Sequence, residues 1–423
     1  MRKSLVAAAV TASVLLLASC AMPADDPNFA GGPGGEVLDA DVASANAEDQ
    51  AALGTADQAP TSIGVDAPLP AVPAEGATIV SLTGGSAYEG VFDTALAEAG
   101  TTLGWTVESV TVDAADPIAV AAAFDEAVAA APDGIHITGS HVDALVDSLP
   151  AAETAGIPVI CTGCSGEPAG GITDTSINGT EQNVLWGTVL ASYVVSSQYD
   201  GEDAGVQVFA LPGGAFSDFN LEFATSLLDQ CRNCSATESV VDPTFLDLAD
   251  PVAVSEFVVS EMSTSLGAWG LLDSGALSEG VADALAGDPT LLSPVVLIGR
   301  GATAADIEAL TALGALAADP AASPDATASP TEEVAEEDAA LLGRTPEQAA
   351  ALQAWIAIPQ PVMAWRVIDQ FARLIGGVEP STGLLPSQLL TGANAADAVV
   401  DDAGNYIGIA DYKEQFAALW GVA

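Results

Sequence analysis

Two C-x-x-C pairs are the most specific spacing for chemistry in this chain of 423 residues: Cys161 with Cys164, and Cys231 with Cys234. Pairs of this kind form structural disulfides, bind zinc or catalyse thiol–disulfide exchange. A single zinc site would need all four sulfurs within tetrahedral reach, and neither pair opens a predicted helix as redox-active pairs do. We therefore expect two local disulfides, with zinc binding and redox chemistry as the alternatives.

Motifs for hydrolysis and for phosphate binding are missing from the sequence. There is no G-x-S-x-G elbow, no H-E-x-x-H and no phosphate loop. The chain has two histidines, His136 inside a predicted strand and His141 just after it. We therefore expect a protein without enzymatic activity, catalytic residues, metal or cofactor.

The elements that would position polar residues alternate strictly between strand and helix from Ala77 to Cys164. Apolar or alternating runs predict four strands, at Ala77–Thr83, Trp105–Val112, Ile135–Thr138 and Pro158–Thr162. Helical spacing predicts three helices between them, at Tyr88–Leu103, Pro117–Ala130 and Val142–Ala155. Strands separated by helices form parallel sheets, which bind ligands outside the carboxyl ends of their strands. The fold class is therefore α/β, and the function is expected at those ends.

A second series of the same kind follows, between Val184 and Gly299. Its predicted strands are Val206–Leu211, Thr237–Val241, Trp269–Asp273 and Val295–Gly299, with helices between them. The sequence thus predicts two doubly wound parallel-sheet lobes. From 319 to 348 a run of Pro, Ala, Ser and acidic residues breaks the pattern. We interpret this run as a low-complexity surface insertion, with a docking element for a partner as the alternative.

The N-terminus has the pattern of an export signal. A basic start at 1–3 is followed by an apolar run from Leu5 to Leu17 and by LASC at 17–20, which resembles the lipobox of bacterial lipoproteins. The resemblance implies cleavage of 1–19, a lipid on Cys20 and an extracytoplasmic protein anchored to the cell membrane. An ordinary cleaved signal peptide is the alternative. Residues 20–76, rich in Ala, Asp, Gly and Pro, are expected to form a flexible tether.

The charge balance excludes two classes of partner. The chain carries 58 acidic and 8 basic residues, a formal net charge of -50. Binding to nucleic acid and electrostatic attraction to anionic lipid both require a basic surface. We therefore expect no nucleic-acid partner and contact with a membrane only through the lipid anchor, and we expect a monomer.

Four segments resemble the type I periplasmic binding proteins, the ribose-binding-like sugar receptors of ABC importers. They are PDGIHITGSHVDAL at 132–145, AGIPVICT at 155–162, IAIPQPVMAWRVIDQFARLIGG at 356–377 and NYIGIADYKEQFAALWG at 405–421. The resemblance implies two lobes, joined by three crossings, that close on a sugar like a hinged clamp. It divides the chain into an N-terminal lobe of 77–162 and 357–392 and a C-terminal lobe of 163–356 and 393–423.

The same resemblance implies where a sugar would bind. Sugar pockets combine flat aromatic rings with polar groups for the hydroxyls. In this family such residues follow the first and third strands, end strands of the second lobe and lie at the crossings between lobes. The candidate ligand contacts at these places are Ser86, Tyr88, Ser140, His141, Asn183, Phe216, Asp218, Asp273 and Gln360.

Two of these candidates have a competing structural interpretation: Tyr88 as a partly buried residue at a helix start, and Asp273 as a helix cap. The strand ending at Gly299-Arg300-Gly301 departs from the family's glycine–hydrophobic–aspartate pattern, which indicates a differently charged or unusual ligand. We interpret the protein as a solute-binding lipoprotein that captures a sugar or sugar-like solute for an ABC permease. A binding module of the same fold that presents its ligand to a sensor kinase or chemoreceptor is the alternative.

Overall fold

The structure is a computed structural model that describes residues 53–113, 116–197, 204–211, 216–231, 233–241, 256–258, 260–262, 269–278, 281, 295–318 and 351–423. The expected signal peptide, Cys20, the first part of the expected tether and the expected insertion at 319–348 lie outside the described residues. Within the described segments, no helix is long and apolar enough to cross a membrane.

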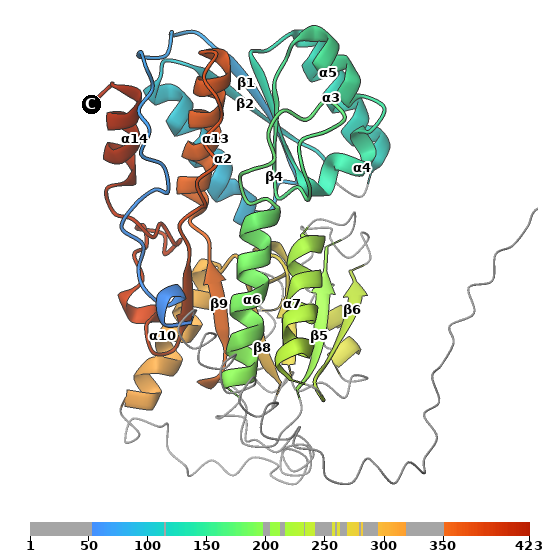
Figure 1. Cartoon of the computed structure of the whole chain (residues 1–423), viewed down its shortest axis with the longest axis vertical. Helices are drawn as coiled ribbons and strands as arrows, with labels where there is room; N and C mark the ends of the chain where they lie inside the picture. The colour runs from blue at the N-terminus through green and yellow to red at the C-terminus, as the bar shows by residue number, and fades with distance from the viewer. Residues whose placement is uncertain are drawn as a thin grey trace, which may run out of the picture. The chain divides into compact units, whose positions relative to one another are not determined.

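The first sheet contains four parallel strands in the order β2-β1-β3-β4 (Figure 1). The strands are β1 (Thr78–Thr83), β2 (Thr106–Thr111), β3 (Gly134–Thr138) and β4 (Val159–Thr162), connected through α2 (Ala87–Thr102), α3 (Pro117–Ala130) and α5 (Leu149–Ala155). Strands β3 and β4 are buried, whereas β2 lies at the edge and is largely exposed. These parallel pairings confirm the predicted sheet. Apolar strands that alternate with helices form such sheets because the helices cover both faces.

Helix ends in this region follow local sequence signals. Ser86 and Glu89 form a capping box at the start of α2, in which each residue's backbone N–H donates to the other's side chain at 3.1 Å. Asp116 caps α3, as predicted. The helix predicted over 142–155 is instead divided into α4 (Val142–Leu145), preceded by the 3-10 turn η1 (Gly139–His141), and α5. Pro150 explains the break, because it lacks an N–H and its ring would clash with the carbonyl four residues earlier.

The second sheet contains six strands in the order β10-β9-β8-β7-β5-β6. They are β5 (Gly205–Ala210), β6 (Ser235–Val240), β7 (Trp269–Leu272), β8 (Val296–Arg300), β9 (Ala354–Ala357) and β10 (Gln388–Thr391), and all pair in parallel except β10, which is antiparallel to β9. Helices α6 (Thr180–Ser196) and α7 (Ser217–Gln230) pack side by side and share a core with this sheet (Figure 1), and α10 (Ala304–Ala318) follows β8. The bodies built on the two sheets are referred to below as the first and second lobes.

Two helices from late in the sequence complete the first lobe. Helix α13 (Gln360–Ile375) is buried along most of its length and packs against α2, and α14 (Tyr412–Trp420) packs beside it (Figure 1). The rings of Trp365 and Trp420 stack with centroids 5.2 Å apart, and the Trp420 indole donates to Asp369 at 3.0 Å. These contacts make α13 the central helix of the first lobe's core.

The predicted division of the chain at 392 and 393 differs from this arrangement in two places. Strand β10 pairs with β9 and so belongs to the sheet of the second lobe, although the prediction assigned it to the first. Helix α14 belongs to the core of the first lobe, although the prediction assigned it to the second. Helix α14 lies there because Tyr412, Phe416 and Trp420 form an aromatic face that packs against the ring of Trp365 in α13.

Residues 53–76 are packed on the folded lobes, which corrects the expectation of a flexible tether throughout 20–76. Ile63 and Val65 are buried in the core of the first lobe. Leu53 and Ala56 pack against the core of the second lobe. We name residues 53–65 the strap, because they connect the two cores. The composition did not predict this packing, because only four spaced apolar side chains attach the segment to the two cores.

Buried side chains also hold this segment through its backbone carbonyls. The Ile63 carbonyl accepts from Arg366 at 3.5 Å, and the Ala67 carbonyl accepts from Arg373 at 2.6 Å. The indole of Trp105 donates to the Ala74 carbonyl at 2.8 Å. The segment therefore satisfies polar groups that burial would otherwise leave unpaired.

Candidate functional site

The carboxyl ends of the two sheets meet where Tyr88 contacts the second lobe. Tyr88 lies in the first turn of α2, directly after β1, and its ring rests on the backbone of Gly275 and Gly301. A Cβ atom at Gly275 would lie 2.2 Å from the Gly301 carbonyl oxygen and 2.7 Å from the Tyr88 ring, so a larger residue would disrupt this contact. The Tyr88 hydroxyl accepts a hydrogen bond from the amide of Gln360, the first residue of α13. The structure thus brings together two of the predicted ligand contacts.

Arg300 ends β8 beside this contact. Its guanidinium carbon lies 3.8 Å from the ring centre of Phe216. One terminal nitrogen donates to the Asn178 side chain at 2.6 Å and the other to the Asp273 carbonyl at 3.4 Å. The side chain is buried, and its Nε has no hydrogen-bond partner among the described residues. Because a guanidinium carries five N–H donors, these two hydrogen bonds leave Arg300 with donors that the described residues do not use.

Asp273 follows β7 and is fully buried next to Arg300. Its two oxygens accept from the Leu211 N–H at 3.2 and 3.1 Å, and Oδ2 also accepts from the Asn220 amide at 3.1 Å. Burial raises the pKa of the Asp273 carboxyl to about 7, although these hydrogen bonds and the charge of Arg300 act in the opposite direction. Burial likewise lowers the pKa of Arg300 to about 10. Both groups have lost water, so a ligand that hydrogen-bonds to them meets little competition from solvent.

Three more candidates lie near this cluster or support it. Phe216 precedes α7 in the left-handed conformation, at φ 59°, and places its ring under Arg300. Asn183, fully buried in α6, donates to the Asn178 carbonyl at 3.0 Å and so fixes the residue that accepts from Arg300. Asp218 accepts from the Thr180 hydroxyl at 2.5 Å, which ties α7 to α6. Phe216 and Asn183 therefore belong to the cluster, whereas Asp218 joins two helices, and its contact with a ligand stays a prediction.

Ser86 and His141 have partners within the first lobe. The hydroxyl of Ser86 takes part in the capping box of α2. Nδ1 of His141 lies 3.3 Å from the Thr138 hydroxyl, and its Nε2 has no partner among the described residues. Burial lowers the pKa of His141 to about 4, so its ring is neutral near pH 7. The Ser140 side chain lies outside the described residues. Contact of these residues with a ligand stays a prediction.

Two residues of the cluster are absent from the sequence candidates, Arg300 and Asn178. Arg300 ends a predicted strand, so the rule that selected Asp273 selects it too, and only the departure from the family pattern set it aside. Asn178 lies between β4 and α6 in the left-handed conformation, at φ 56°, and no motif marks it. Its role depends on Arg300, which is distant in the sequence.

Both C-x-x-C pairs form local disulfides in the structure. Cys161 bonds to Cys164 and Cys231 to Cys234, with Cα atoms 5.8 and 5.3 Å apart. The first disulfide closes the turn after β4, where Gly163 contacts the Phe216 ring. Among the described residues, no group of three or more His, Cys, Asp or Glu side chains is arranged to hold a metal ion.

Solved structures of sugar-binding proteins share this fold. An ABC transporter solute-binding protein from Agrobacterium vitis, bound to α-D-tagatopyranose, has a TM-score of 0.55 at 15% identity and covers 78% of this chain and 99% of its own. GanP, a glucose-galactose binding protein from Geobacillus stearothermophilus, has a TM-score of 0.54 at 12% identity, over 75% of this chain and 98% of its own. A periplasmic solute-binding protein from Actinobacillus succinogenes with bound D-allose has a TM-score of 0.54 at 11% identity, over 76% and 99%.

No protein-family model and no curated protein matches the sequence. At these low identities the structural likeness establishes the fold. The chain has the two-lobed α/β fold of the type I periplasmic binding proteins, as the sequence resemblance predicted.

Proposed function

We propose that this protein is an extracytoplasmic solute-binding protein that captures a sugar or sugar-like solute between its lobes for an ABC importer. The observation that carries the proposal is the cluster of Tyr88, Phe216, Asp273, Arg300 and Gln360 where the carboxyl ends of both sheets meet. Ligands of open α/β sheets bind at such ends. The similar solved proteins are named for binding tagatose, glucose, galactose and allose, which supports a sugar here.

The side chains of the cluster suit a polyhydroxylated ring. The aromatic rings of Tyr88 and Phe216 provide flat apolar surfaces for the C–H faces of a sugar. The carboxylate of Asp273 accepts hydrogen bonds from hydroxyls, and Arg300 donates to hydroxyl oxygens. None of these roles requires bond cleavage, so we propose binding without turnover. Solute binding would then shift the equilibrium between open and closed lobes, and the permease would recognise the closed form.

The experiment that tests this proposal is a thermal-unfolding screen against hexoses, pentoses, polyols and nucleosides, followed by calorimetry of each hit. A ligand at a hundred times its Kd adds about 2.7 kcal/mol of stability. Asp273→Asn should weaken the hit about tenfold, because an amide replaces a charged acceptor. Glu98→Gln is the control, since Glu98 is exposed and pairs with Lys413 in the first lobe. A folded protein that no sugar or polyol stabilises contradicts the proposal.

We also propose that Cys20 carries the lipid that anchors the protein to the cell membrane. Labelling of growing cells with radioactive palmitate should mark the wild-type protein and not the Cys20→Ser variant. Loss of sugar uptake in a deletion strain, restored by the wild-type gene, would support the importer. A strain that keeps its uptake but loses a transcriptional response to the sugar would instead support the sensor module.

A further inference from the structure

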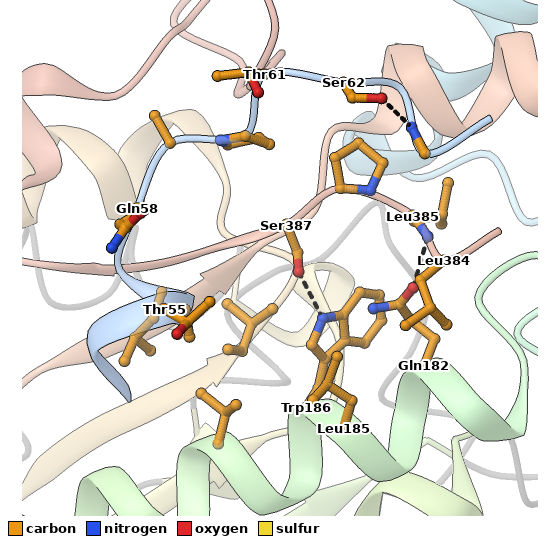
Figure 2. A pocket seen from close by; sticks show the side chains of 18 residues that line it. Thr55, Gln58, Thr61, Ser62, Gln182, Leu185, Trp186, Leu384, Leu385 and Ser387 are labelled. Atoms are coloured by element: carbon orange, nitrogen blue, oxygen red, sulfur yellow. Dashed lines mark hydrogen bonds between the residues drawn. The ribbon is translucent and has the colours of Figure 1, made fainter. Parts of the chain in front are cut away.

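A second pocket lies beneath the strap and is lined by none of the candidate ligand contacts (Figure 2). Its volume is about 650 Å³, and it is partly open to solvent. The strap forms one wall, a side of α6 forms another, and the segment 384–389 leading into β10 forms the third. This volume is within the range of pockets that bind small organic molecules.

The lining of the strap pocket carries no charge. Its 18 residues include no Asp, Glu, Lys, Arg or His, although the chain as a whole has 58 acidic residues. Most of the wall is aliphatic, and the ring of Trp186 adds an aromatic surface. A charged molecule would lose hydration here without meeting an opposite charge, so the pocket selects an uncharged one.

One hydrogen-bond donor in this wall lacks a partner. Gln182 is 2% exposed, and its Oε1 accepts from the Leu385 N–H at 2.7 Å. A backbone N–H can only donate, so this bond fixes which end of the amide is oxygen. Nε2 of Gln182 has no partner among the described residues, and Figure 2 shows the amide nitrogen on the side of the Trp186 ring. A ligand oxygen bound there would satisfy a buried donor that is otherwise costly to leave unpaired.

The other polar group near the ring is already occupied. The indole N–H of Trp186 donates to the Ser387 hydroxyl at 2.8 Å. The pocket is also held in place at the strap, where the Asp57 carbonyl accepts from Gln388 at 2.9 Å and from Asn394 at 3.1 Å. The walls are therefore fixed by the protein, and Nε2 of Gln182 is the buried donor in the lining that has no partner among the described residues.

We propose that the strap pocket is a second binding site, for a small uncharged molecule with an apolar body and one hydrogen-bond acceptor. The acceptor binds Nε2 of Gln182, and the apolar body packs against Trp186 and the aliphatic wall. The site is separate from the sugar site, and its ligand is of a different chemical class.

The test uses three matched probes with the full chain: acetophenone, which has an acceptor; ethylbenzene, which has none; and benzoate, which is charged. Binding is followed by ligand-observed NMR titration and by hydrogen exchange of the strap amides. Acetophenone should bind saturably, about tenfold more tightly than ethylbenzene, because one buried hydrogen bond distinguishes them. Benzoate should not bind, and acetophenone should slow exchange in the strap.

Two variants locate the site. Gln182→Glu keeps the acceptor for Leu385 and removes the amide donor, so acetophenone affinity should fall about tenfold. Gln230→Glu makes the same change in α7, where Gln230 donates to Ser192, and should leave affinity unchanged. The proposal is overturned if acetophenone does not saturate, if Gln182→Glu binds it like the wild type, or if ethylbenzene binds equally well.

Discussion

Charge is buried in two regions of this protein and is held differently in each. In α13, Arg373 forms an ion pair with Asp369 at 2.8 Å and also donates to the Ala67 carbonyl. At the candidate site, Arg300 and Asp273 lie close together, but Arg300 donates to neutral oxygens and the Asp273 carboxylate accepts from other donors. The Arg373–Asp369 pair satisfies its charges by direct contact, whereas Arg300 and Asp273 retain hydrogen-bonding capacity.

This difference separates scaffold from site. A buried ion pair with direct contacts fixes the structure, and removal of one partner leaves the other uncompensated. A buried cation without a direct ion pair lowers the stability of the protein unless a ligand compensates its charge. Functional sites often contain charged groups of this kind. The predictions below test this separation through variants of each region.

The largest effect is expected from Asp369→Ala. It leaves the buried charge of Arg373 unpaired and removes the acceptor of the Trp420 indole. The free energy of unfolding should fall by about 3–5 kcal/mol, measured by urea denaturation. Asp369→Asn keeps an acceptor for the indole and should lose less. A loss below about 1 kcal/mol for the alanine variant would contradict the scaffold role.

Arg300→Met should show a different profile. Sugar affinity should fall by about 10- to 150-fold, which corresponds to the loss of hydrogen bonds from a charged group. The free energy of unfolding should fall by about 1–3 kcal/mol, less than in Asp369→Ala, because the buried Asn178 side chain loses its donor. Arg300→Lys should also lose most of the affinity, since it lacks the planar fork. If Arg300→Met destabilises the protein as much as Asp369→Ala does, the two regions do not differ.

Sugar binding should depend on pH through Asp273. The pKa of its carboxyl is about 7 in the folded protein, above the ordinary 3.8. The group is therefore protonated in the folded state below pH 7, and its contribution to stability is present at pH 4 and lost as the pH rises to 7. Affinity should change in the opposite sense, rising from pH 6 to pH 8 as the carboxylate acceptor forms. Calorimetry between pH 5 and 8 should show this rise in the wild type, and a flat profile in Asp273→Asn.

The smallest effect is expected from Tyr88→Phe. This change removes the hydrogen bond with Gln360 and keeps the ring on Gly275 and Gly301. That hydrogen bond joins two helices of the first lobe and does not reach the sugar, so sugar affinity, measured by calorimetry, should fall by no more than about 1.5 kcal/mol. Tyr88→Ala removes the ring as well and should lose more. Equal losses in the two variants would show that the ring does not contact the sugar.

The sequence allowed the two parallel sheets to be predicted, because each strand is an apolar run followed by a helix with recognisable spacing. The family resemblance implied Tyr88, Asp273 and Gln360, and the structure places all three where the carboxyl ends of the sheets meet, although their contact with a ligand stays a prediction. It did not locate Asn178, because that residue acts through a contact with Arg300 across 122 positions. The strap and α14 were also misjudged, since what buries them are surfaces that form only after the lobes fold.

The strap also decides where a recombinant fragment of this protein can begin. Composition suggests a start at residue 75, where the Pro- and Asp-rich segment gives way to the first strand. A fragment cut there would lack Ile63 and Val65 and would expose the part of the first lobe's core against which they pack. The cut would also remove the Ile63 and Ala67 carbonyls, which accept from Arg366 and Arg373. Such a truncation would be prone to aggregate, and its failure to bind any sugar would say nothing about the ligand. A fragment that starts just before Leu53 keeps these contacts. It is therefore the shortest fragment that we would use for biochemical work.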